Sequence, residues 1–122
     1  MSQGFESGDF LIFQLESGYA LLRVIAVDGG DGGDADTIWH LAAFDEFFLD
    51  VDHAEAVIAA KTLPKPSHAH IALTNRAFES TQVAKLVNIP LNESDREFYR
   101  EWQNNPNHEI SDRSVRLMLG LR

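Results

Sequence analysis

Hydrophobic residues in the first third of the chain form three short runs separated by glycine, acidic and polar residues. Residues 8–15 and 19–27 are rich in aromatic and large aliphatic side chains, and each run is too short for a typical helix. The Glu16-Ser17-Gly18 sequence between them is typical of a tight turn. The pattern therefore predicts an N-terminal β-hairpin. A third strand is predicted at residues 37–44, and short connections favour an antiparallel meander.

Capping signals and periodicity predict the elements of the rest of the chain. Asp52 with Glu55, and Ser94 with Glu97, have the spacing of a capping box at the start of a helix. The further predicted elements are a helix beginning at Asp52, strands at residues 69–73 and within 81–91, a helix beginning at Ser94, and a helix over 111–119.

These elements predict an α+β fold in a single domain over residues 1–122. We expect a bent, mainly antiparallel sheet or a partly open β-barrel of about five strands, with two or three packed helices. A hydrophobic content of 44% in 122 residues is ordinary for one globular domain. The predicted core consists of Phe10, Ile12, Leu21, Val24, Ile25, Ile38, Leu41, Val57, Ile71, Leu73, Val83, Leu86, Phe98 and Trp102.

Residues 28–36 contain four glycines and four aspartates, a composition that cannot supply a core. This segment is predicted to be a flexible loop. Aspartates and carbonyls can bind Ca²⁺, but an EF-hand loop starting at Asp28 would end on Trp39 instead of glutamate. We expect no cofactor, and ion binding by this loop is left open.

Acidic residues are concentrated in the first half of the chain. Residues 1–60 contain 12 acidic residues and one basic residue, and residues 61–122 contain seven acidic and nine basic residues, which gives the net charge of −9. Phosphate recognition requires clustered Lys and Arg, so nucleic acid is not expected as a partner. Binding to an anionic membrane surface is also disfavoured, because the acidic first half of the chain would be repelled by it. A basic protein is the partner that this charge favours.

Further sequence features indicate the cellular compartment in which the protein is expected. No apolar run approaches the length of a membrane span. The first residues lack the basic start and apolar core of a secretory signal. The absence of cysteine excludes a disulfide framework and thiolate chemistry, and the expected location is the cytoplasm.

Residues 45–52, here called the acidic-aromatic segment, are the strongest candidate for partner binding. Aromatic rings supply contact area, and surrounding carboxylates orient a basic partner. One ring can fill the core while the acidic side chains remain in solvent. The candidate binding residues are Asp45, Glu46, Phe47, Phe48, Asp50 and Asp52.

Two alternatives remain open. A metal-binding or enzymatic domain could use His40, His68 and His70, since imidazoles on neighbouring strands can converge on one metal ion. A structural or regulatory adaptor could instead dimerise through C-terminal helices, with an apolar stripe at Val115, Met118 and Leu119. The chain lacks a Gly-x-Ser-x-Gly motif, and we expect no enzymatic activity and no resident metal.

The opening hairpin resembles that of the immunity protein 26-like family. The residues concerned are Gly8, Asp9, Phe13, Leu15, Gly18, Tyr19, Ala20, Arg23 and Val24, and residues 85–91 resemble a later strand of that family. Its members are found beside polymorphic toxins in bacteria and are thought to neutralise a cognate toxin. The resemblance implies an immunity or antitoxin-like protein that occludes a basic toxin, as a monomer or a weak homodimer.

Overall fold

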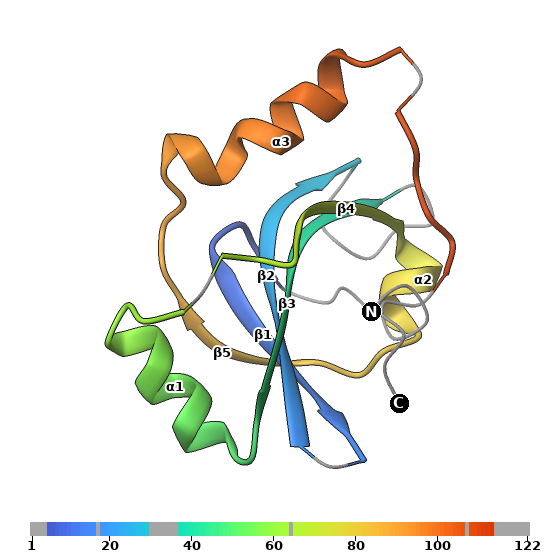
Figure 1. Cartoon of the computed structure of the whole chain (residues 1–122). Helices are drawn as coiled ribbons and strands as arrows, with labels where there is room; N and C mark the ends of the chain where they lie inside the picture. Colours follow the sequence, from blue (N-terminus) through green and yellow to red (C-terminus); the bar gives the residue numbers. More distant parts are fainter. Residues whose placement is uncertain (1–4, 17, 30–36, 64, 107, 114–122) are drawn as a thin grey trace.

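A single antiparallel sheet with three helices forms the part of the chain that the computed structural model describes, residues 5–16, 18–29, 37–63, 65–106 and 108–113 (Figure 1). The strand order is β4-β3-β2-β1-β5, and the sheet does not close because β4 and β5 remain its edges. This confirms the predicted α+β class. The elements are β1 (Asp9–Leu15), β2 (Gly18–Asp28), β3 (Ile38–Phe48), α1 (Val51–Ala59), β4 (His68–Thr74), α2 (Asn75–Glu79), β5 (Ala84–Asn88) and α3 (Glu93–Asn104).

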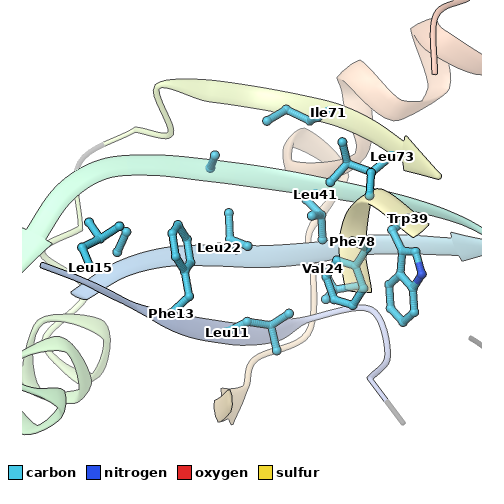
Figure 2. Packing of buried hydrophobic residues seen from close by; sticks show 13 residues of the cluster. Leu11, Phe13, Leu15, Leu22, Val24, Trp39, Leu41, Ile71, Leu73 and Phe78 are labelled. Atoms are coloured by element: carbon cyan, nitrogen blue, oxygen red, sulfur yellow. The ribbon is translucent and has the colours of Figure 1, made fainter. Parts of the chain in front are cut away.

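The first core fills one face of the sheet, where alternate residues of four strands meet (Figure 2). The short helix α2 closes this core: Phe78 stacks on the Trp39 indole with ring centroids 4.1 Å apart. The buried Trp39 Nε1 donates to Asn75 Oδ1 at 2.9 Å, so its polar atom is satisfied. The main members are Leu11, Phe13, Leu22, Val24, Trp39, Leu41, Ile71, Leu73 and Phe78.

A second core lies on the opposite face, where α1 packs over one end of the strands. Its buried members are Phe10, Ile12, Leu21, Phe44, Phe48, Ala54 and Ile58. α3 covers the other end of β2 and β4 (Figure 1). The same face therefore carries an apolar layer under α1 and a more polar layer under α3.

An irregularity in β2 changes which side chains reach α3. The pairing of β2 with β3 shifts between Val24 and Ala26, which is a β-bulge at Ile25. Because side chains alternate along a strand, one extra residue exchanges the two faces. Val27 consequently packs against the first core, and Asp28 faces the α3 side together with His40.

The helix starts differ from those predicted. Asp50 caps α1 by accepting from His53 N, so the capping role assigned to Asp52 is wrong. Asn92 caps α3 and forms a reciprocal capping box with Asp95, two residues before the predicted pair. In both cases an earlier Asp or Asn has the same capping chemistry. None of the described helices is long and apolar enough to cross a membrane.

Several sequence expectations are corrected elsewhere in the fold. β3 continues to Phe48, α2 was not predicted, and Asp28 belongs to β2 instead of a loop. Residues 30–36 of the Asp/Gly segment lie outside the described residues. Phe98, predicted as core, is 50% exposed. The other predicted core residues are buried or half-buried.

The C-terminal segment also departs from its predicted helix. Ser111 forms an isolated parallel bridge with Leu73 of β4, through Ser111 N to Ala72 O at 2.8 Å and Thr74 N to Ser111 O at 3.0 Å. Residues 111–113 of the predicted helix are not helical, although Ser111 Oγ accepts from Arg113 N at 3.1 Å as a capping serine would. Residues 114–119, with the proposed dimer stripe at Val115, Met118 and Leu119, lie outside the described residues.

Truncation of a core leucine tests the packing. Leu22 is completely buried, and Leu22→Ala is expected to lower the free energy of unfolding by about 3 kcal/mol because it leaves a cavity. Leu49 is 82% exposed, so Leu49→Ala should change stability by less than about 0.5 kcal/mol. Urea unfolding of both variants measures the difference. Equal losses would contradict the described packing of the first core.

Candidate functional site

The acidic-aromatic segment forms the end of β3 and the connection to α1. Tyr19 pairs with Phe48 and Ala20 with Phe47, beside the turn of the β1–β2 hairpin. A Cβ on Gly18 would lie 2.6 Å from the Phe48 carbonyl oxygen, so the close approach of the two strands requires glycine there. The hairpin turn thus holds the start of the segment in place.

The two phenylalanines of this segment have opposite environments. Phe48 is 1% exposed and packs in the second core, with its ring edge-on to that of His53 at 5.5 Å. Phe47 is 56% exposed and Leu49 is 82% exposed. Of the residues proposed for binding, Phe48 is therefore a core residue, and Phe47 is at the surface. Leu49 is an exposed apolar neighbour that the sequence-based assignment omitted.

The acidic side chains around these residues face solvent. Glu46, Asp50 and Asp52 are exposed, and among the described residues none of them forms an ion pair with Lys or Arg. One oxygen of Asp50 is used to cap α1, at 2.7 Å from His53 N. The described side chains do not include that of Asp45. The segment therefore presents unneutralised carboxylates beside exposed apolar side chains.

A second candidate site consists of a hydrogen-bonded histidine pair beneath α3. His40 is completely buried, and its Nε2 lies 2.8 Å from Asp28 Oδ2. Its Nδ1 lies 2.9 Å from His70 Nε2, so both nitrogens of His40 are occupied. The Tyr99 hydroxyl of α3 donates to both oxygens of Asp28, at 2.8 and 2.9 Å. These contacts join three strands and α3 into one polar network.

The three histidines proposed for metal binding are only partly brought together. His68 lies on the same strand as His70, but it is exposed, and its Nδ1 contacts the Ser67 hydroxyl at 3.3 Å. His40 has no nitrogen left for a metal unless its existing hydrogen bonds break. Among the described residues, no group of three or more His, Asp or Glu side chains is arranged to hold a metal ion.

Burial sets the protonation of this network. Desolvation lowers the pKa of His40, and the opposing effect of Asp28 is smaller. Burial, followed by the charge of His40, lowers the pKa of His70 to about 4. Burial also raises the pKa of Tyr99 to about 12, assisted by its hydrogen bond to Asp28. Near neutral pH the two imidazoles are neutral and the phenol is protonated.

These protonation states fix the direction of every hydrogen bond in the network. The Asp28 carboxylate can only accept, so His40 donates from Nε2. Neutral His40 then has a lone pair on Nδ1, which requires His70 to donate from Nε2. The remaining nitrogen of His70, Nδ1, consequently carries a lone pair.

α3 covers the network with aromatic side chains. The Trp102 ring meets the His40 ring edge-on at 4.6 Å and stacks on His108 at 4.0 Å. Trp102 Nε1 donates to the Glu109 carbonyl oxygen at 2.8 Å, which holds the indole against the following segment. Trp102 thus contributes to this site from a half-buried position.

Comparison with known proteins gives no assignment: no family model, curated protein or solved structure matches the chain. The assignment of a function therefore depends on the geometry of the two candidate sites.

The sequence-based prediction missed Asp28 and Tyr99. Asp28 was assigned to the Asp/Gly loop, and Tyr99 was passed over between Phe98 and Trp102. The available signal was the i, i+3 spacing of Tyr99 and Trp102, which places both on one face of a helix. The partners of that face could not be read from spacing alone.

The His70 environment predicts a loss of stability in acid. The pKa of His70 is 6.5 in its ordinary state and about 4 when folded, so between these values the unfolded chain binds more protons. The contribution to stability is complete above about pH 6.5 and is lost as the pH falls toward about 4. We expect a loss of about 1 to 2 kcal/mol, reduced from the full shift because His70 is only partly buried.

Urea unfolding at pH 7 and pH 4.5 measures this loss. Carboxylate groups also titrate in this range, but their contribution is common to all variants and cancels when the variants are compared. His70→Gln retains a donor to His40 but removes the titration, so its stability should fall less in acid than that of the wild type. His68→Gln is the matched control on the same strand and should follow the wild type. Identical acid dependence in the wild type and His70→Gln would contradict the assignment.

Proposed function

We propose that this protein is an acidic protein-binding module that binds a basic protein partner through the acidic-aromatic segment. The observation that carries the proposal is the exposure of Phe47 and Leu49 beside the unneutralised Glu46 and Asp52. Exposed apolar side chains next to each other mark interaction surfaces more often than isolated ones do. The resemblance of the hairpin to immunity protein 26-like proteins supports an immunity or antitoxin-like role.

Burial of apolar surface supplies affinity in this proposal. An aromatic anchor at the centre of an interface commonly dominates the binding energy, and Phe47 is the ring available in the segment. Phe48 has a different role, because its ring in the second core fixes the backbone from which Phe47 projects. Pairing with β2 makes that backbone rigid, which reduces the entropy lost on binding.

Charge supplies steering and partner selection. The first 60 residues have a formal charge of −11, from 12 acidic residues and Arg23, while the whole chain has −9. A field of this sign accelerates encounter with a basic protein and disfavours nucleic acid. Inhibition would follow by steric occlusion of the partner. The proposed role is non-catalytic and cytoplasmic, in a monomer or weak homodimer.

Alanine substitution of the exposed apolar pair tests the contact surface. Phe47→Ala with Leu49→Ala should weaken binding of the basic partner captured by the wild-type protein at least about tenfold. Both side chains are exposed, so stability should change little. Isothermal titration with that partner gives the affinity. Unchanged affinity would exclude this surface as the interface.

Charge neutralisation tests the electrostatic part separately. Glu46→Gln with Asp52→Asn avoids Asp50, whose side chain caps α1. The matched control is Glu97→Gln with Glu101→Gln, which removes the same charge from exposed positions on α3. Association should slow in the first variant more than in the second, and the difference should vanish in about 1 M salt, where the Debye length is about 3 Å. A difference that salt does not alter would reject steering by the segment.

A further inference from the structure

A separate pocket of about 420 Å³ lies between β4, the end of α3 and the segment that follows it. Its lining includes His70, Trp102, His108, Glu109 and Ser111. This volume is within the range of small-molecule sites. The pocket lies beside the histidine network, and none of the residues of the acidic-aromatic segment lines it, so it is independent of the proposed partner surface.

His70, one of the residues that line the pocket, has a hydrogen-bond acceptor whose tautomer is fixed by the network. The chain from Asp28 through His40 to His70 leaves the lone pair on His70 Nδ1. In the described part of the protein, the only buried side-chain polar atoms without a hydrogen bond are Arg23 Nε and Thr81 Oγ1. His70 Nδ1 is not one of them, and none of the described residues forms a hydrogen bond with it. Because His70 lines the pocket, we take its Nδ1 as the acceptor for an N–H donor bound there.

The charge of the lining favours a cation. The described residues that line this pocket include Glu109 but no Lys or Arg, and the Asp28 carboxylate lies behind His40. A second cleft of about 560 Å³, on the side of Tyr99 that faces β2, is lined by two basic residues, Arg96 and Arg100, and one acidic residue, Glu6. As far as the described lining residues show, the two clefts beside α3 thus differ in charge, and fixed positive charge is found only in the second one.

The geometry points to a binding site for the guanidinium group of a small molecule or of an arginine side chain. A guanidinium has five N–H donors in one plane, which suits the separated acceptors His70 Nδ1, the Glu109 carboxylate and the Ser111 hydroxyl. Asp28 stabilises the site by holding His40, and through it His70, in the accepting tautomer. Trp102, fixed by its bond to the Glu109 backbone, forms the adjacent wall.

Nitrogen NMR of histidine-labelled protein with three probes at pH 7.5 tests this site. Methylguanidinium has both charge and N–H donors, methylurea has donors without charge, and tetramethylammonium has charge without donors. We expect methylguanidinium to shift the His70 Nδ1 resonance and to bind at least about tenfold more tightly than either control. Equal binding by methylurea or by tetramethylammonium would overturn the proposal.

Variants locate the binding. His70→Phe keeps a flat ring without the acceptor and should weaken methylguanidinium binding about tenfold, whereas His53→Phe, at an exposed histidine that does not line the pocket, should not. Retained binding in His70→Phe would refute the role of Nδ1. The wild-type spectrum gives a second check that needs no variant, since a proton on His70 Nδ1 would also refute the accepting role of this nitrogen.

A capped Gly-Arg-Gly peptide identifies the source of the guanidinium group. Tighter binding than that of methylguanidinium indicates an arginine of a protein, and weaker binding indicates a free small molecule.

Discussion

The antiparallel pairing of β2 with β3 supplies the surface that β1, β4 and the three helices contact, and β5 is attached through β1. Both strands have 11 residues, and their alternating side chains enter two different cores. Leu22 and Leu41 face the interior closed by α2, while Leu21 and Phe44 face α1. Because both faces are buried, a slip of one residue would place the wrong side chains in both cores. The register of this pair therefore fixes the positions of the acidic-aromatic segment and of the histidine network.

Much of the fold follows from local signals that this sequence contains. The hairpin could be predicted because its two apolar runs flank a turn sequence, and α1 because an acidic cap precedes an apolar stretch. The caps were displaced by two residues because Asp50 and Asn92 are as suitable as Asp52 and Ser94. α2 was not predictable in the same way, since a five-residue helix has too few positions for a periodic pattern.

The sites were less accessible to sequence reasoning. The exposure of Phe47 and burial of Phe48 agree with the expected division, because adjacent residues in a strand face opposite sides. The network around His40 depends instead on the bulge at Ile25, which moves Asp28 to the His40 face. A strict alternation would place Asp28 in the first core. No residue type at Ile25 signals the bulge, so the partner of His40 could be found only from the structure.

The attachment of α3 has a consequence for how the molecule opens. No side chain of this helix is fully buried, and the helix is held by the Arg23–Asp95 ion pair at 3.3 Å, the Tyr99 hydroxyl and the Trp102 ring contacts. The sheet is held by two extensive apolar cores. Elements with few buried apolar contacts exchange amide hydrogens through local opening at low free energy, ahead of global unfolding. We therefore expect α3 to open as a separate cooperative unit, and its detachment would admit water to His40 while the sheet remains folded.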